Sequence, residues 1–342
     1  MRRRPTSPPP PQPLTHPAII LVFMPPTTDA LRRYRLFVWG IVAFTVLVIL
    51  SGDLVQATES GAGCGESWPR CDGSLIPVIG NAHTAVEFTH RVVTTVLSIS
   101  FIAMVIGARK LFGRGTLVWR TTLWATGILI LEIMLGAALV LFGWVEANAS
   151  WGRVVADCLH VINTFMLVGS VTLVAHFAGD NPGFRIDPNS RRDRYLISSV
   201  AILITIAVSG TLNSLADTLY LSDSVDVDET PIAALLVNIR GIHPAIAIVG
   251  GAIIFYLVHL TAAQATGTVA KLALTIQGVI GLQFLVGIFN IVLLTPLETQ
   301  ILHLTLADAL WLLILILSAY TLASPSPSTD EPRTTGGISA VS

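Results

Sequence analysis

Long apolar stretches constrain this chain more than any other feature of its sequence. Each is about as long as an α-helix must be to cross the hydrocarbon core of a bilayer, roughly 20 residues. Only helices and closed barrels satisfy their backbone hydrogen bonds inside a membrane. The sequence therefore predicts an all-α integral membrane protein with eight transmembrane helices, at approximately residues 36–57, 84–108, 119–143, 154–178, 195–218, 234–260, 269–294 and 299–323.

Composition excludes several other classes of protein. Charged residues make up 12% of the 342 residues and apolar residues 53%, whereas a soluble domain carries about 25% charged residues. A water-soluble globular fold is therefore excluded. The net charge of −1 leaves no basic surface for nucleic acid. Three cysteines are too few for a disulfide framework, although they allow one pair and one spare.

Basic residues predict how the chain is oriented in the membrane. They concentrate before the first stretch and in alternate loops, at Arg32, Arg33, Arg35, Arg109, Lys110, Arg114, Arg120, Arg185, Arg191, Arg192, Arg194 and Lys271. By the positive-inside rule, both termini are cytoplasmic in a multi-pass protein of the plasma membrane. The Pro-rich residues 1–35, with Met24 as an alternative start, predict a disordered arm, and residues 324–342 predict a disordered tail.

The two halves of the chain resemble each other. Ser51-Gly52-Asp53-Leu54 corresponds to Ser209-Gly210-Thr211-Leu212, residues 131–136 correspond to 282–287, and Leu159-His160 corresponds to Leu302-His303. Four spans per unit give both copies the same orientation. We therefore predict two pseudo-symmetric four-helix bundles, residues 36–180 and 195–323, related by an axis along the membrane normal. Chance similarity between apolar helices is the alternative.

Four histidines occupy alternate stretches of the repeat. His90, His160, His243 and His303 lie in the second, fourth, sixth and eighth stretches, each about two turns inside the outer end. Ionisable residues inside a membrane mark function by default. Two facing imidazoles in one bundle are what bis-histidine ligation of haem iron requires, whereas zinc needs three or four converging ligands. We predict haem or metal ligation, with a structural role as the alternative.

A polar residue precedes each histidine by three positions, at Glu87, Asp157, Arg240 and Gln300. This spacing places it on nearly the same helical face, one turn nearer the outside, where it can bond an imidazole, hold water or meet a haem propionate. Arg240 suits a propionate because guanidinium matches carboxylate geometry, and Glu87 suits proton or water chemistry. Ordinary interfacial polar residues are the alternative.

The longest outer loop, residues 58–83, contains two of the three cysteines. Cys64 and Cys71 face an oxidising compartment, where a disulfide persists. With Trp68 and the nearby glycines they predict a lid above the His90/His160 site. The disulfide is either structural or an exposed, redox-active pair. Cys158 is predicted to be a small packing residue.

Taken together, these residues resemble the heme A synthase family over roughly residues 36–322. The resemblance depends on residues 52–61, residues 64–73, Glu87-Phe88-Thr89-His90-Arg91, Leu159-His160, His243 and Leu302-His303. The resemblance implies that the chain oxidises the C8 methyl group of haem o to a formyl group, giving haem a for cytochrome oxidase assembly. That reaction is an oxidation at a CH group with water as the oxygen source.

The resemblance also implies a role for each site residue. His90 and His160 would face the substrate haem o, and His243 and His303 would hold a haem b cofactor. Glu87 matches an acidic residue with a catalytic role. Arg91 and Arg240 would lie near propionates or support the ligands, and Cys64 and Cys71 would form a disulfide needed for haem transfer or electron flow.

This sequence departs from the family pattern at several positions, among them Pro244, which follows His243 where the first half has Arg91. The outer loop between the fifth and sixth stretches is acidic and carries no cysteine, although many relatives have a second cysteine pair there. Glu132 occupies a mid-span position where a neutral amide is common, and Gln283 fills the matching place in the second half. A mid-bilayer Glu132 either relays protons or is kept protonated by desolvation.

Expected partners follow from this reaction: haem o as substrate, the haem o synthase that supplies it, and a membrane quinone or another electron acceptor. The oligomeric state stays open, a homo-oligomer included. One alternative function is a bis-haem b electron-transfer cytochrome without haem-modifying activity, which explains the histidines but not the cysteine lid or the contrast of Glu87 with Arg240. A transporter is the other, although the sequence shows no paired Gly/Pro breaks at mid-span.

Overall fold

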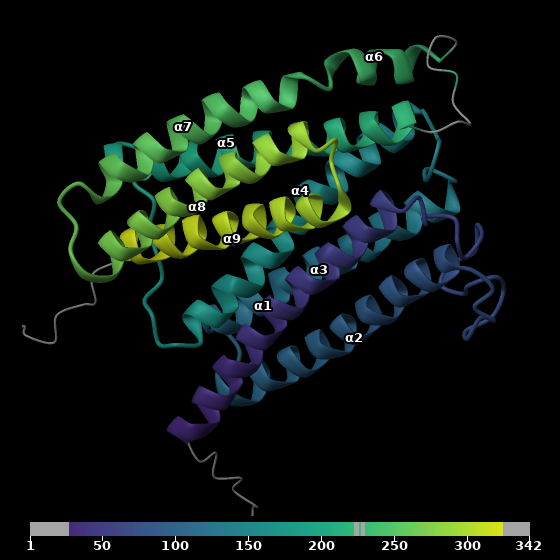
Figure 1. Ribbon diagram of the computed structural model, residues 1–342. Coiled ribbons are helices and arrows are strands. Elements are labelled where there is room, and N and C mark those ends of the chain that lie inside the picture. The colour runs from purple at the N-terminus through teal and green to yellow at the C-terminus, as the bar shows by residue number, and fades with distance from the viewer. Residues whose placement is uncertain (1–26, 222–225, 227–229, 324–342) are drawn as a thin grey trace, which may run out of the picture.

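The computed structural model describes residues 27–221, 226 and 230–323, and its regular elements in these ranges are all helices (Figure 1). They are α1 (Thr28–Ala57), α2 (Ala82–Leu111), α3 (Leu117–Leu141), α4 (Trp151–Phe177), α5 (Arg191–Leu221), α6 (Pro231–Ile239), α7 (Ile242–Ala262), α8 (Gly267–Val292) and α9 (Leu297–Thr321). All but α6 are long and apolar enough to cross a membrane. The predicted fold class is therefore confirmed.

Several helices extend beyond the predicted apolar stretches, and one expectation is corrected. Residues 28–35 belong to α1 and not to a disordered arm. The Thr27 hydroxyl caps this helix by accepting from the Ala30 N–H, and Arg33 pairs with Asp29 one turn away. The predicted arm over residues 1–26, the tail 324–342 and most of the acidic loop lie outside the described residues.

The helices of each half form a closed ring of neighbours. In the first half α1 packs on α2, α2 on α3, α3 on α4 and α4 on α1. In the second half α5, α7, α8 and α9 repeat this order, so that α7 takes the place of α2, α8 that of α3 and α9 that of α4. The same neighbour order in both halves supports the repeat inferred from sequence.

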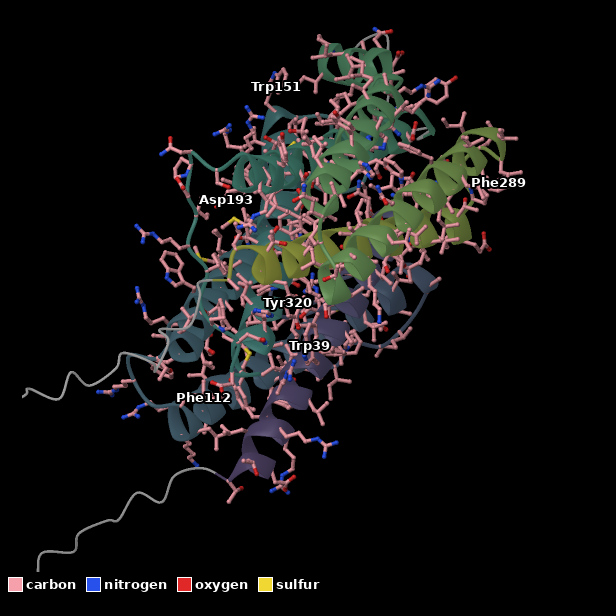
Figure 2. All side chains as sticks on the ribbon, turned by 90° about the vertical axis from the view of Figure 1, so that its left-hand side faces the viewer. Trp39, Phe112, Trp151, Asp193, Phe289 and Tyr320 are labelled. Carbon is pink, nitrogen blue, oxygen red and sulfur yellow. A yellow bond between two sulfur atoms is a disulfide. The ribbon has the colours of Figure 1, made fainter. Side chains whose placement is uncertain are left out.

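The two rings meet through α4 and α9, with further contacts from α1 and α5. Of the membrane-spanning helices, α4 has the largest share of its apolar window buried. Its Phe165 packs edge-to-face on Trp311 of α9, whose indole N–H donates to the Phe165 carbonyl at 2.8 Å. Figure 2 shows Trp151, at the start of α4, and Phe112, just after α2, at opposite ends of the molecule.

The sixth predicted span, 234–260, is broken in the structure. Helix α6 ends at Ile239 and α7 begins at Ile242, with a turn at Arg240 and Gly241. Pro244 explains the break, because a proline has no N–H for the carbonyl four residues earlier and its ring collides with that carbonyl. The expectation of one continuous helix here is therefore wrong, and His243 is the second residue of α7.

Candidate functional site

The first pair of histidines lies inside the first ring. His90 is the ninth residue of α2 and His160 the tenth residue of α4. Their imidazoles are near enough to interact electrostatically. His90 Nδ1 lies 2.7 Å from the Ser51 hydroxyl on α1, and Gly52 allows this approach because a Cβ there would stand 3.2 Å from His90 Cε1. The structure thus brings His90 and His160 together as predicted.

The second pair repeats this arrangement. His243 Nδ1 lies 3.0 Å from the Ser209 hydroxyl on α5, and a Cβ on Gly210 would stand 3.2 Å from His243 Cε1. His303, the seventh residue of α9, is near enough to His243 for an electrostatic interaction. His243 therefore meets its partner even though the helix is broken just before it.

The serine contacts indicate which ring nitrogen is free. Ser51 donates its single hydroxyl proton to the Val48 carbonyl at 2.7 Å, and Ser209 donates to the Ile206 carbonyl at 2.8 Å. Each hydroxyl must then accept from its imidazole, so that His90 and His243 carry the proton on Nδ1. Their Nε2 atoms keep the lone pair that a metal ligand needs, with Nδ1 oriented by a hydrogen bond as in most metal-binding histidines.

Glu132 on α3 stands beside the other histidine of the first half. Its carboxylate lies 3.7 Å from His160 Nδ1, accepts from the Asn163 amide at 2.6 Å and contacts the Thr164 hydroxyl. At the matching position of the second half, the Gln283 amide lies 3.2 Å from His303 Nε2. The repeat thus places a carboxylate in one half and an amide in the other next to the equivalent imidazole.

The cysteine loop is fixed onto the N-terminal end of α2, which we call the outer end after the orientation predicted from the sequence. Cys64 and Cys71 form a disulfide, and both are fully buried. The Cys64 N–H donates to Glu87 Oε2 at 2.6 Å, and the Thr84 hydroxyl donates to the Gly63 carbonyl at 2.7 Å. Only glycine fits at position 63, because a Cβ there would lie 2.4 Å from the His83 carbonyl oxygen.

Arg91 completes this attachment. Its guanidinium pairs with Glu87 Oε1 and donates to the carbonyls of Ser67 at 2.8 Å and Arg70 at 2.7 Å. Glu87 is only 3% exposed. We call this arrangement the Glu87–Arg91 latch. Because Glu87 lies one turn outside His90, the latch fixes the disulfide loop one turn above the first histidine pair. Most Arg91 donors are thus used within the protein, which leaves little for a propionate.

Asp157 and Arg240, two of the other predicted polar residues, sit at the outer ends of the halves. Asp157 lies 3.5 Å from the buried Arg153 guanidinium, which also donates to carbonyls of the loop between α3 and α4. Arg240 is half-exposed, with its guanidinium 4.2 Å from the Tyr220 ring and 4.0 Å from Asp217. Among the described residues, the Arg240 guanidinium makes fewer contacts than that of Arg91, so Arg240 is the better candidate to bind a propionate.

The fourth polar residue contributes least to the site. Gln300 donates from its amide to the Thr295 carbonyl at 2.7 Å and so ties down the turn between α8 and α9. This contact agrees with the interpretation of Gln300 as an ordinary polar residue near a helix start. Cys158 is half-buried and unpaired with another cysteine within the described residues.

The histidine pairs fit a haem better than a bare metal ion. In the described ranges, no three His, Cys, Asp or Glu side chains converge as metal ligands. A porphyrin brings four nitrogen ligands of its own and requires only axial ones from the protein. The buried Nδ1 atoms of His160 and His303 have no hydrogen-bond partner among the described residues. Iron ligation through Nε2 would place the imidazole proton on Nδ1, and in His303 it would also require the Gln283 amide to move away from Nε2.

Sequence reasoning missed the two serines as partners of the histidines. Their only signal was the repeated Ser-Gly pair at 51–52 and 209–210, which indicated a repeat and not a contact.

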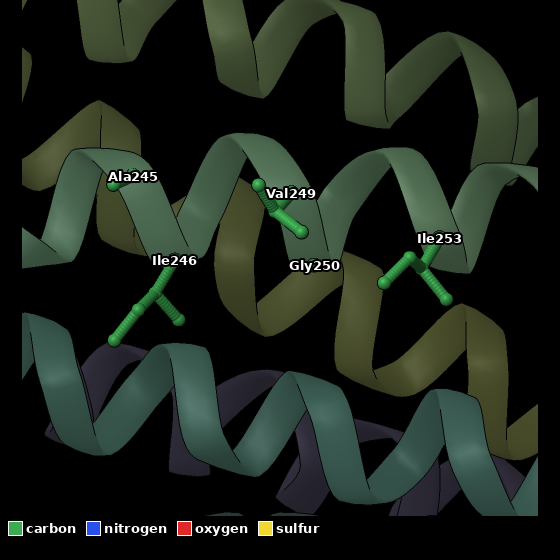
Figure 3. A pocket seen from close by; sticks show the side chains of 5 residues that line it. All are labelled: Ala245, Ile246, Val249, Gly250 and Ile253. Atoms are coloured by element: carbon green, nitrogen blue, oxygen red, sulfur yellow. The ribbon is translucent and has the colours of Figure 1, made fainter.

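An apolar groove runs along α7 and is lined by Ala245, Ile246, Val249, Gly250 and Ile253 (Figure 3). It has no polar side chain in its lining and is separate from the histidine pairs.

These features define a multi-span membrane protein with a serine-oriented histidine pair in each half and a disulfide loop over the first. The chain belongs to the cytochrome oxidase assembly protein family, COX15-CtaA, which it matches over residues 35–315. The resemblance drawn from the sequence motifs is thereby confirmed.

Similar proteins carry two different names. A protoheme IX farnesyltransferase of Thermus thermophilus is 35% identical over 303 residues, which are 86% of this chain and 49% of the relative. Heme A synthases of Lysinibacillus sphaericus and Halalkalibacterium halodurans are 40% and 41% identical over 116 and 100 residues, or 33% and 29% of this chain and 38% and 33% of theirs. The matches thus span about half or less of these relatives.

Proposed function

We propose that this protein is a heme A synthase, which oxidises the C8 methyl group of haem o to a formyl group for cytochrome oxidase assembly. The observation that carries the proposal is the pair of equivalent histidine sites, of which only the first lies beneath a latched disulfide loop within the described residues. Two similar sites with different outer ends suit one haem that stays bound as a cofactor (the resident group) and one haem that enters as substrate and leaves as product (the exchanged group).

The first half suits the exchanged group. His90 and His160 would position the iron of the substrate haem o, since His90 Nε2 is free to do so. Conversion of the methyl to the formyl group consumes one water and releases four electrons and four protons, through hydroxymethyl and dihydroxymethyl stages. Water would thus supply the inserted oxygen, and a proton acceptor is required beside the reacting carbon.

Glu87 is our candidate for that acceptor. Oε1 is occupied by Arg91 and Oε2 accepts one bond from Cys64, so Oε2 keeps one acceptor position for a water. Glu87 would orient the water and take its proton as oxygen bonds to the oxidised carbon. Its latch partner Arg91 and the buried disulfide above would exclude bulk solvent from this point.

The second half suits the resident group. His243 and His303 would hold haem b, with Arg240 as the propionate partner because its guanidinium is half-exposed beside the site. When bound, haem b supplies one-electron transfer between the substrate site and an acceptor such as a membrane quinone. The residues of this chain would set its orientation through the Ser209 hydrogen bond to His243.

Membrane placement and partners complete the proposal. The basic residues of alternate loops support cytoplasmic termini in the plasma membrane. Haem o is hydrophobic, so direct transfer from the enzyme that farnesylates protohaem is favourable. The match of this chain to about half of a relative named protoheme IX farnesyltransferase supports such a partnership with haem o synthase.

The test is to purify the protein from cells that supply haem o, extract the non-covalent haems and separate them by chromatography with mass detection. Haem a or its alcohol precursor beside haem b is the expected result. Haem b alone, with haem o available, contradicts the synthase and supports an electron-transfer cytochrome instead.

Glu87→Gln tests the proton acceptor in the same assay. We expect haem binding to persist while the alcohol accumulates and haem a falls at least tenfold, within the range of about 10²–10⁴ for general base catalysis. Arg91→Lys is the control for the latch, because it loses guanidinium contacts to the loop carbonyls but keeps a cation beside the Glu87 carboxylate. It should lower total conversion without changing the ratio of alcohol to aldehyde. Haem a at normal yield from Glu87→Gln would rule out the proposed role.

A further inference from the structure

The disulfide loop carries an apolar tip that packs against little of the protein. We define the outer tip as residues 75–79, which lie between the disulfide and α2. Leu75, Ile76 and Val78 are 74%, 82% and 93% exposed, and Ile79 is also exposed. Such a contiguous run of exposed aliphatic side chains marks an interaction surface.

The rest of the loop is firmly attached, so the exposure of the tip is not a sign of a loose segment. Cys71 pairs with Ser74 through backbone bonds in both directions, at 2.8 and 3.0 Å. The Ser74 hydroxyl donates to the Ile76 carbonyl at 2.9 Å. Pro77, within the tip, is buried. The tip therefore presents its side chains from a fixed base.

The chain connection places the tip at the membrane surface. Only Gly80 and Asn81 separate Ile79 from the start of α2 at Ala82. At about 3.3–3.6 Å per residue, Ile79 lies within roughly 11 Å of the beginning of a membrane-spanning helix. Figure 1 shows the loop between α1 and α2 reaching sideways past the outer end of α2, at the edge of the first half.

Two further features agree with contact to lipid. The exposed face of α2 below the loop is aliphatic, at Val92, Val96, Ile99, Ile102 and Ile106. No Asp, Glu, Lys or Arg occurs from residue 73 to residue 86, between Asp72 and Glu87. The tip and the exposed face of α2 are thus both apolar, whereas the charged side chains of Glu66, Arg70 and Asp72 occupy the earlier part of the loop.

We propose that the outer tip inserts into the headgroup–acyl boundary of the outer leaflet. The loop then joins two environments. Through the Glu87–Arg91 latch it is attached above the first histidine pair, and through Leu75, Ile76, Val78 and Ile79 it is anchored in phospholipid. Apolar side chains at the end of a fixed loop bind an interface in proportion to the area they bury there.

Depth-dependent fluorescence quenching tests this anchoring. Val78→Cys and Glu66→Cys would each be made in a Cys158→Ala background, labelled without reductant with an environment-sensitive fluorophore, and placed in phospholipid nanodiscs. Glu66 is the matched control, because it is exposed in the charged part of the same loop, between the two cysteines. Mass spectrometry would verify that Cys64 and Cys71 stay oxidised.

The label at position 78 should be quenched several-fold more by lipids with a nitroxide near the headgroup than by aqueous iodide, and the label at position 66 should show the reverse. Leu75→Cys gives a second reporter if Val78→Cys does not fold. Iodide quenching at both positions would overturn the proposal. Protection at position 78 from both quenchers would overturn it too, because a second copy or another protein would then cover the tip.

Discussion

The two halves share their histidine chemistry and differ at their outer ends. In both, a serine from the first helix of the ring orients an imidazole that a neighbouring glycine allows to approach. Above the first pair, Glu87 and Arg91 fix a disulfide loop. Above the second, Arg240 lies in a helix break, half-exposed beside Tyr220 and Asp217, and residues 195–323 contain no cysteine.

This comparison separates the residues that both proposed haem sites share from the residues that are particular to one of them. The Ser–His–Gly arrangement is common to both halves, so we assign it to the haem ligation proposed for both. Within the described residues, the Glu87–Arg91 latch and the disulfide loop occur in the first half alone. We therefore assign them to the reaction proposed for that half. Replacing the shared residues should affect both halves alike, and replacing the particular ones should affect them differently.

Removal of one of the proposed axial histidines should have the largest effect and should distinguish the two halves. His303→Ala should abolish the retention of haem b, because one imidazole and its iron bond are lost. His90→Ala should retain haem b and lose conversion of haem o to haem a. Absorbance of the reduced pyridine complex measures retained haem, and chromatography measures conversion. Equal loss of haem b from both variants would contradict the assignment of substrate to the first half and cofactor to the second.

The next largest difference is expected between the alanine variants of Arg91 and Arg240, in their effect on stability. Arg91→Ala breaks a buried ion pair and leaves Glu87 without its partner, which typically costs about 3–5 kcal/mol. Arg240 forms a half-exposed pair at 4.0 Å, and pairs of that kind contribute about 0–1 kcal/mol. Thermal unfolding in detergent, with and without haem, compares the two. We expect only Arg91→Ala to make the Cys64–Cys71 disulfide rapidly reducible.

Much of this architecture could be predicted from the sequence, because apolar length and loop charge act over whole helices. The number of membrane-spanning helices and the pairing of His90 with His160 followed from such signals. The break at Arg240 and Gly241 did not, although Pro244 carries the physical cause, because the apolar run continues across it. The Glu87–Arg91 latch was also missed, since it depends on carbonyls of a loop 21 and 24 residues away from Arg91.

Loss of the serine hydroxyls should have a moderate and equal effect. Ser51→Ala and Ser209→Ala each remove the acceptor that fixes an imidazole tautomer, and such supporting contacts typically alter metal affinity by about 10–100-fold. Haem titration of each half, with the other half disabled by its histidine variant, measures this directly. A loss confined to one half would break the inference that both histidines are oriented for ligation in the same way.

The smallest effect is expected at the two glycines that face the histidines. In Gly52→Ala and Gly210→Ala the new Cβ stands 3.2 Å from an imidazole carbon, so the ring must shift by a few tenths of an ångström. Alanine also favours the helix by up to about 1 kcal/mol over glycine, which partly offsets the crowding.

Gly127→Ala and Gly278→Ala are matched controls, because nothing lies within 4 Å of a Cβ at either position. The controls should raise the midpoint of thermal unfolding, while Gly52→Ala and Gly210→Ala should leave it nearly unchanged and shift the haem absorbance of their own half. If the four variants behave alike, the close approach of glycine to histidine is not needed to hold the rings in place.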